Sequence, residues 1–167
     1  MNLVQTDRLT LVPQTAQHAA EMYSVLNDPA IYEFENIPPV SIEWLADRFS
    51  RLETRCSPDG TEQWLNWVIR LPELRLIGYV QATIDQLGGA RIHYEMSSAF
   101  WGRGLATEAV DAMIHELSKC YRVFEFTAVY KSKNQRSRRL LDRLGFIPAI
   151  ASSVDADESS MRRRIDP

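Results

Sequence analysis

The sequence contains few of the residues that build common metal and redox sites. Its two cysteines, Cys56 and Cys120, form no CxxC pair, and we expect them to stay reduced in a cytoplasmic protein. The three histidines show no metal-ligand spacing, and no HExxH motif is present. The sequence therefore predicts no metal site.

Long hydrophobic runs are also missing. No apolar stretch is close to the length of about 18 residues that a membrane span needs. The N-terminus has neither the basic start nor the apolar core of a secretion signal. The net charge of −3 and the pI near 5.6 give no overall attraction to nucleic acid. We therefore expect a cytoplasmic protein without a membrane or nucleic-acid partner, while the oligomeric state, a homodimer included, stays open.

The chain has the length and composition of one globular domain. Its 167 residues are enough to bury a core, and 45% hydrophobic and 25% charged residues are ordinary values. We expect a single domain over residues 1–167.

Apolar periodicity and turn signals predict alternating strands and helices. The predicted strands are residues 8–13, 64–71, 74–84, 91–96, 123–129 and 146–150. The predicted helices are residues 15–27, 41–52, 106–117 and 134–144. This order favours a mixed sheet with helices on both faces. The tail from Ala151 carries no pattern that assigns it to either class.

An unusual use of glycine lies just before the third predicted helix. The chain has seven glycines, and two of them, Gly102 and Gly104, flank Arg103 in the stretch WGRGLATEA. The first turn of a helix exposes unpaired N–H groups, and glycine lets an anion approach the backbone closely. The stretch therefore predicts a phosphate or pyrophosphate site. It matches neither a Walker A loop nor GxGxxG, so a plain glycine turn remains the alternative.

A second feature is the basic segment around the last predicted helix. Asn134 and Ser137 open this helix, and Leu144-Gly145-Phe146 closes it. Six basic residues face one acid, Asp142; they are Lys131, Lys133, Arg136, Arg138, Arg139 and Arg143. Most of these charges fit a solvated helix face. Near a phosphate loop, however, they also suit a ligand that carries several phosphates.

These motifs together resemble the GNAT N-acetyltransferases, in particular the branch of the ribosomal-protein N-terminal acetyltransferases. The matching stretches, in family order, are Thr6–Leu11, Asn27–Pro29, Ile77–Tyr79, Tyr94–Met96, Trp101–Ala109, Asn134–Ser137 and Leu144–Phe146. The family loop pattern Gln/Arg-x-x-Gly-x-Gly/Ala is kept except that Trp101 replaces the polar first residue. The resemblance implies an α/β (α+β mixed) fold with a central, mixed, mostly antiparallel, twisted sheet of six to seven strands and about four helices on both faces.

The resemblance also implies acetyl-CoA as co-substrate. Its pyrophosphate would lie on the backbone of residues 102–106, and its pantetheine arm would pair with the strand near Met96 and Ser98. The residues implied in acetyl-CoA binding are Met96, Ser98, Trp101, Gly102, Arg103, Gly104, Leu105, Ala106, Thr107, Asn134 and Ser137. Glu108, in the first turns of the helix, is expected to stabilise the loop.

The implied reaction is direct attack of an amine on the thioester in a ternary complex, which needs no enzyme nucleophile. A backbone N–H near Met96 would stabilise the oxyanion. Ser137 is the candidate acid or thiolate stabiliser, although it could simply hydrogen-bond the coenzyme or cap the helix. Glu95 and His93 are the candidate bases, because Ala90 occupies the place of a glutamate in some relatives; a packed polar role for His93 is the alternative.

The acceptor is a small-molecule amine or a protein N-terminus, and the sequence does not choose between them. Residues expected to attract or line the amine are Glu33, Glu35, Asp85, Tyr32, Phe34 and Trp67. The alternative function is a non-catalytic acyl-CoA-binding sensor or regulatory module. A nucleic-acid-binding role would rest only on the basic helix and on Arg162–Arg164.

Overall fold

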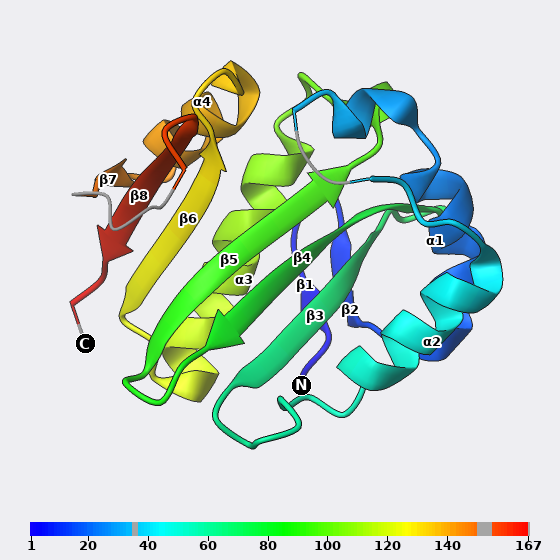
Figure 1. Cartoon of the computed structure of the whole chain (residues 1–167), viewed down its shortest axis with the longest axis horizontal. Coiled ribbons are helices and arrows are strands. Elements are labelled where there is room, and N and C mark those ends of the chain that lie inside the picture. The colour runs from blue at the N-terminus through cyan, green and yellow to red at the C-terminus, as the bar shows by residue number, and fades with distance from the viewer. Residues whose placement is uncertain (35–36, 150–154, 167) are drawn as a thin grey trace.

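The computed structural model describes residues 1–34, 37–149 and 155–166, and one eight-stranded sheet organises them (Figure 1). The strand order is β1-β2-β3-β4-β5-β6-β8-β7. All neighbouring strands are antiparallel except β5 and β6, which are parallel. The strands are β1 Val4–Gln5, β2 Thr10–Pro13, β3 Gln63–Arg70, β4 Leu76–Ile84, β5 Gly89–Met96, β6 Glu125–Lys131, β7 Ile147–Pro148 and β8 Glu158–Arg164.

Helices cover both faces of this sheet. The α-helices are α1 Ala19–Leu26, α2 Ile42–Leu52, α3 Leu105–Tyr121 and α4 Gln135–Arg143, and the short 3-10 helices are η1 Ala16–His18, η2 Pro29–Tyr32 and η3 Ser98–Phe100. Ser41 caps α2, because its Oγ accepts a hydrogen bond from the Trp44 N–H at 3.1 Å. The predicted mixed, mostly antiparallel sheet between helices is confirmed.

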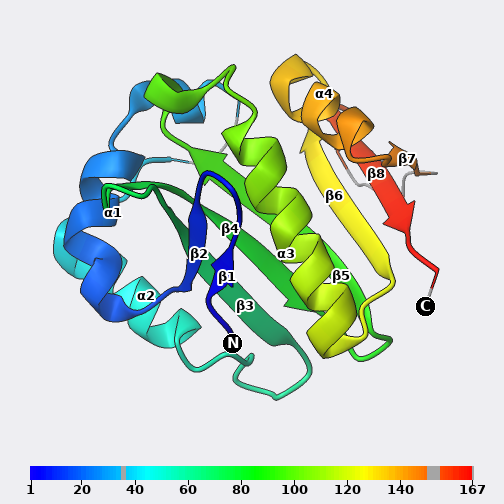
Figure 2. The ribbon, with the colours of Figure 1, turned by 180° about the vertical axis from the view of Figure 1, so that it is seen from behind.

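Side-chain alternation along the strands divides the core into two clusters. On β5, Ala90, Ile92 and Met96 point toward α3 and pack with its apolar stripe, which includes Val110 and Met113. Figure 2 shows α3 lying across this face. On the opposite face, α1 and α2 form a separate apolar cluster with residues of β3 and β4. The odd-numbered residues of β5 therefore face the α1–α2 side.

The strands β5 and β6 separate soon after they begin. Their parallel pairing runs from Gly89↔Glu125 to Arg91↔Thr127 and includes three residue pairs. Figure 1 shows β6 diverging from β5 beyond this point. Since no other strand of the described chain lies between them, the second half of β5 presents an edge to the space where α3 and α4 meet.

A close backbone approach fixes the end of β5 against β4. Gly78 pairs with Met96, and a Cβ at Gly78 would collide with the carbonyl oxygen of Glu95. The φ of Gly78 is not in the left-handed region, so backbone conformation does not require glycine here. The close contact with β5 does.

The main difference from the sequence prediction lies in the C-terminal tail. Seven residues of β8 pair with β6, although only Met161 of β8 is buried. The predicted strand 146–150 shortens to β7, Ile147–Pro148, and residue 150 lies outside the described residues. The short β1 is also additional. It arises because the chain folds back on itself and pairs Val4 with Leu11.

Among the described residues, no helix has the length and apolar character that crossing a bilayer requires. The same residues contain no cluster of three or more side chains that could hold a metal ion.

Candidate active site

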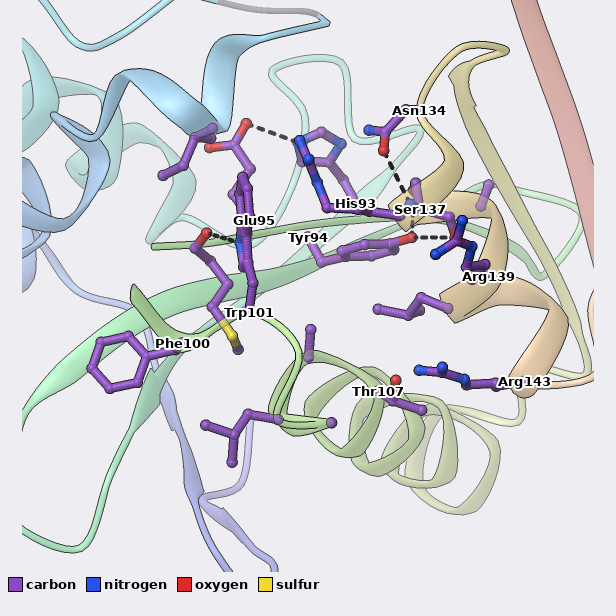
Figure 3. A pocket seen from close by; sticks show the side chains of 18 of the residues that line it. His93, Tyr94, Glu95, Phe100, Trp101, Thr107, Asn134, Ser137, Arg139 and Arg143 are labelled. Carbon is purple, nitrogen blue, oxygen red and sulfur yellow. Dashed lines mark hydrogen bonds and ion pairs between the residues drawn. The ribbon is translucent and has the colours of Figure 1, made fainter. Parts of the chain in front are cut away.

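A cavity of about 290 Å³ lies where β5 separates from β6, between the N-terminal ends of α3 and α4. Figure 3 shows side chains from β5, from the loop before α3, and from α4 converging on it. The predicted site residues that line it are His93, Glu95, Met96, Trp101, Gly102, Gly104, Leu105, Ala106, Thr107, Asn134 and Ser137.

The glycine loop brings the N-terminus of α3 to this cavity. Gly102 and Gly104 both have φ of +76°, which side-chain-bearing residues rarely adopt. Gly104 is the N-cap of α3, and its carbonyl accepts the first helical hydrogen bond from the Glu108 N–H at 3.0 Å. The N–H groups of residues 105–107 have no acceptor within the helix for this reason. These residues line the cavity, so the loop can bind an anion there.

The basic side chains of α4 add positive charge to the same cavity. Arg139 and Arg143 line it; in Figure 3 Arg143 projects from α4 toward Thr107, and Arg139 lies near Ser137 and the end of the Tyr94 side chain. The helix N-terminus and these two arginines together suit a ligand with more than one phosphate.

An ion pair between Arg8 and Glu108 braces the loop. Arg8 Nε donates to Glu108 Oε2 at 2.6 Å, and Arg8 Nη1 donates to the Arg103 carbonyl oxygen at 2.8 Å. Thr6 Oγ1 also donates to Glu108 Oε1, at 2.6 Å. Burial alone would raise the pKa of Glu108, but the hydrogen bonds from Thr6 and Arg8 outweigh it and lower that pKa. These contacts place Glu108 where it can stabilise the loop as expected.

Trp101 ties the loop back to β5. Its indole Nε1 donates to the Met96 carbonyl oxygen at 2.8 Å, and the guanidinium of Arg136 lies 4.1 Å from the ring centroid. Arg136 also pairs with Glu33 at 2.7 Å. The tryptophan that replaces the usual polar residue thus holds the end of β5 and stacks with α4.

Ser137 has a partner that the sequence did not reveal. Its Oγ lies 2.6 Å from the Tyr94 hydroxyl, and its N–H donates to Asn134 Oδ1 at 3.1 Å. Figure 3 shows Tyr94 reaching from β5 toward the start of α4. The sequence identifies Tyr94 only as part of the Tyr94–Met96 motif, although its alternation with Ile92 and Met96 on one strand face indicates that it points toward this cavity.

Glu95 and His93 lie at the boundary between this cavity and a second one. The second cavity, of about 820 Å³, lies between the sheet and α2. Four residues line both cavities, namely Ile92, His93, Glu95 and Val129. The Glu95 side chain is 11% exposed, and its Oε1 lies 3.4 Å from His93 Nε2. The two cavities therefore meet at a carboxylate.

Two tyrosines surround this carboxylate on the α1–α2 side. Burial, and then the negative charge of Glu95, raise the pKa of Tyr79 far above its ordinary value. The same causes, in the same order, raise the pKa of Tyr32, whose hydroxyl donates to the Leu26 carbonyl oxygen at 2.6 Å. Both tyrosines line the second cavity and remain neutral phenols at physiological pH.

The structure does not bring Ser98 and Arg103 into the first cavity. The Ser98 N–H, proposed to bind pantetheine, instead donates to Asp28 Oδ2 at 2.7 Å. The Arg103 guanidinium lies 5.5 Å from the Phe100 ring centroid, outside the cavity. Burial would raise the pKa of Asp28, but hydrogen bonds from Ser98, Ala30 and Ser97 lower it, so this carboxylate stays charged and fixes the end of β5.

The residues expected around the amine are only partly brought together. Tyr32 lines the second cavity, whereas Trp67 is fully buried in the α3-side core and donates to the Asn2 carbonyl oxygen. Asp85 accepts hydrogen bonds within the β4–β5 turn, far from Glu95 along the strand. Both expectations were wrong, because side-chain alternation and the turn direct these residues elsewhere.

The other residues of that expected set lie near the Arg136 side chain. Glu33 forms its ion pair with Arg136, and Phe34 lies under the same guanidinium at 5.5 Å. Glu35 lies outside the described residues.

Comparison with known proteins identifies the family. Residues 8–147 match the acetyltransferase (GNAT) domain. The N-acetyltransferase p20 of Bacillus licheniformis, itself uncharacterised, is 26% identical over 148 residues, which cover 87% of this chain and 83% of that protein.

Solved structures show the same fold at low sequence identity. RimL, a ribosomal L7/L12 alpha-N-protein acetyltransferase in complex with coenzyme A, superposes with a TM-score of 0.84 at 16% identity, covering 99% of both chains. The microcin C7 self-immunity acetyltransferase MccE, in complex with acetyl-CoA and AMP, gives 0.81 at 20% identity, covering 96% of this chain and 94% of its own. Since the domain match extends from the Arg8 brace to β7 and includes the glycine loop, the chain belongs to the GNAT family of acetyltransferases.

Proposed function

We propose that this acetyltransferase transfers the acetyl group of acetyl-CoA to a primary amine by direct attack in a ternary complex. The observation that carries the proposal is the carboxylate of Glu95 at the junction of two cavities. A thioester in the first cavity and an amine in the second would meet beside a group that can accept a proton.

The first cavity suits acetyl-CoA. Its pyrophosphate would accept hydrogen bonds from the backbone of residues 102–107, and Arg139 and Arg143 would neutralise phosphate charge. The pantetheine arm would occupy the space between β5 and β6, where its amides can pair with the edge of β5. RimL with coenzyme A and MccE with acetyl-CoA support this placement by their folds.

The reaction then follows in three steps. The amine nitrogen attacks the thioester carbon while Glu95 accepts a proton from the amine, with His93 3.4 Å from its Oε1. The oxyanion of the tetrahedral intermediate is stabilised by a backbone N–H near Met96. The C–S bond breaks and the carbonyl re-forms, while Ser137 gives a proton to the departing thiolate and takes one from Tyr94. Glu95 then releases its proton to solvent and Tyr94 recovers one from solvent, so the enzyme returns to its starting state.

The proposed reaction applies to two classes of acceptor, small amines and protein N-termini. RimL acts on a ribosomal protein, which supports protein N-termini as one class to be tested. All the site residues lie on or beside one continuous sheet, which supports a single domain over residues 1–167. Members of this family typically work in the cytoplasm, and we propose the same location here.

The test is acetyl transfer by the purified protein from acetyl-CoA to a panel of small amines and N-terminal peptides, read by mass spectrometry. Glu95→Gln is expected to lower kcat by about 10²- to 10⁴-fold, the usual contribution of a general base. Its acetyl-CoA affinity, measured by calorimetry, should stay close to that of the unaltered protein. Acetyl-CoA binding without transfer to any amine would replace this proposal with the sensor or regulatory role.

A further inference from the structure

A row of polar side chains crosses the sheet beneath α2. Asn66, Gln81 and His93 are direct cross-strand neighbours on β3, β4 and β5. Gln14 extends the row, because its N–H donates to the Asn66 carbonyl oxygen at 2.9 Å. The row lies beside the apolar cluster that α1 and α2 form with β3 and β4, and burying polar side chains there costs free energy unless they are hydrogen-bonded.

Part of this row lines the second cavity with unused hydrogen-bonding capacity. Gln14, Gln81 and His93 contact the cavity. Gln14 is 2% exposed, and its side-chain Nε2 has no hydrogen-bond partner among the described residues. A buried amide without a partner costs free energy, and a polar ligand in the cavity would satisfy it.

Two arginines add positive charge to the same cavity. Arg91, on β5, and Arg48, on α2, both line it. Within residues 1–34, 37–149 and 155–166, neither guanidinium forms an ion pair with a carboxylate. Arg48 lies 5.8 Å from the Trp44 ring centroid, at the α2 side of the cavity. Among the described residues that line this cavity, two arginines therefore accompany one carboxylate, Glu95.

The two kinds of charge lie at different positions along β5. Arg91, His93 and Glu95 share one strand face, and the last lies four positions after the first. At about 3.3 Å per residue, this separation is about 13 Å. An acceptor with its amine at Glu95 would extend along β5, past the His93 end of the polar row, toward Arg91.

We propose that the acceptor carries an anionic group, a carboxylate or a phosphate, within about 13 Å of its reacting amine. Arg91 binds the anion, and Arg48 adds a second positive charge to the cavity from α2. Gln81, opposite His93, hydrogen-bonds polar atoms between the amine and the anion, and Gln14 faces the same cavity from the end of β2. This inference rests on the proposed function for the position of the amine and extends it to the substrate class.

The test compares acceptors that differ in charge alone. One series is the amidated peptides Ala-Glu-Glu, Ala-Gln-Gln and Ala-Lys-Lys, and the other is 6-aminohexanoate with its neutral amide. We expect kcat/KM for the acidic member to exceed that of its neutral partner by about tenfold or more, the effect of a charge-assisted hydrogen bond. A preference in the peptide series alone would identify a protein N-terminus, and a preference in both series would identify the anion itself.

Arginine variants then test which side chains cause the preference for acidic acceptors. Arg91→Gln should lower the ratio of kcat/KM for the acidic acceptor to kcat/KM for its neutral partner to about three or less. Adding Arg48→Gln should bring this ratio to about one. Arg91→Glu should make the lysine peptide the better substrate. Arg51→Gln is the matched control, since Arg51 is an exposed arginine one turn further along α2 and does not line the cavity. The ratio should also fall as salt is raised, because salt screens the interaction.

A binding measurement separates this inference from the proposed function. Calorimetry titrates each peptide and each aminohexanoic compound into protein saturated with coenzyme A. Tighter binding of the acidic members without any transfer would retain the anion site and reject the proposed reaction. Equal binding and equal rates within both series, or a preference that survives in the Arg48→Gln/Arg91→Gln protein, would overturn the inference.

Discussion

Ser137 and Tyr94 share a hydrogen bond of 2.6 Å across the wall of the first cavity. A serine hydroxyl has one proton, so Ser137 can donate toward the cavity only when Tyr94 donates to Ser137. In that arrangement the tyrosine orients the serine hydroxyl, and each hydrogen bond polarises the next. Tyr94 is therefore a positioning residue, and Ser137 is the group that would contact the thiolate.

Ser137→Ala is expected to lower kcat by about 10- to 100-fold, near the lower end for a general acid. Acetyl-CoA affinity should change by only a few-fold, because the pyrophosphate contacts lie elsewhere. Steady-state kinetics and calorimetry measure the two effects. Ser137→Thr should restore most of the rate. Ser118→Ala is the control, since that hydroxyl donates to the Ile114 carbonyl oxygen within α3. An unchanged kcat in Ser137→Ala would assign the serine a purely structural role.

Among the elements, α3 combines two tasks at its first turn. Its apolar stripe packs against the sheet, while its N-terminus borders the cavity. Gly104 makes this possible because its left-handed φ turns the chain from the loop into the helix. A side chain at this position would lie in ordinary contact with Arg8 Nη2, at 3.5 Å, so the site is not sterically closed.

Charge at Gly104 should therefore matter more than size. Gly104→Asp is expected to weaken acetyl-CoA binding by at least about 100-fold, because a carboxylate near the pyrophosphate is strongly repelled. Gly104→Asn has nearly the same shape and tolerates the left-handed conformation. It should lose about tenfold or less. Calorimetry with both variants, after circular dichroism has shown that they are folded, measures the difference. Equal losses would place the anion away from this loop.

The brace between Arg8 and Glu108 should make stability depend on pH. The folded protein holds the pKa of Glu108 below its ordinary value, so the charged carboxylate stabilises the fold above the unfolded pKa of about 4.3. This contribution is lost as the pH falls through the lower, folded pKa. Glu108→Gln should cost about 1–3 kcal/mol at pH 7. Urea unfolding of both proteins should show that this difference in the free energy of unfolding, present at pH 7, shrinks below pH 4. A constant difference would show that the ionised form is not what stabilises the loop.

On the scale of the whole molecule, the separation of β5 and β6 divides the sheet into two parts, β1–β5 and β6–β8, that few strand pairs connect. Three residue pairs join β5 to β6, whereas seven join β6 to β8. The proposed pantetheine position lies between the two parts. A ligand there would take the place of the missing strand pairing and connect both sides.

Acetyl-CoA should therefore slow amide hydrogen exchange most at residues 92–96 and 105–107. At a concentration of 100 times Kd, binding also stabilises the whole fold by about 2.7 kcal/mol, which raises Tm. Hydrogen exchange followed by mass spectrometry, with and without acetyl-CoA, distinguishes the local effect from the global one. The central strands β3 and β4 serve as the internal reference. Uniform protection across the sheet would argue against a ligand between β5 and β6.

Local signals in the sequence predicted much of this structure. The glycine loop, the Ser41 cap and the alternation on β5 are each determined by neighbouring residues, so their elements and faces were predictable. The strand β8 was not, because its sequence ESSMRRR is polar and becomes a strand through pairing with β6. The Tyr94–Ser137 contact and the second cavity likewise depend on residues distant in the sequence. The loop residues that line the first cavity were therefore predictable, with the exception of Arg103, whereas the residues that support them were missed.

The shared wall of the two cavities has a consequence for inhibitor chemistry. His93 and Glu95 border both spaces, so in the proposed reaction the coenzyme thiol and the acceptor nitrogen would both lie beside these two residues. A bisubstrate conjugate, with coenzyme A joined through its sulfur and a short acyl bridge to an amine, could occupy both spaces at once. Its affinity would gain from the effective concentration that the covalent link provides, which can add about 10²- to 10⁴-fold beyond either half alone.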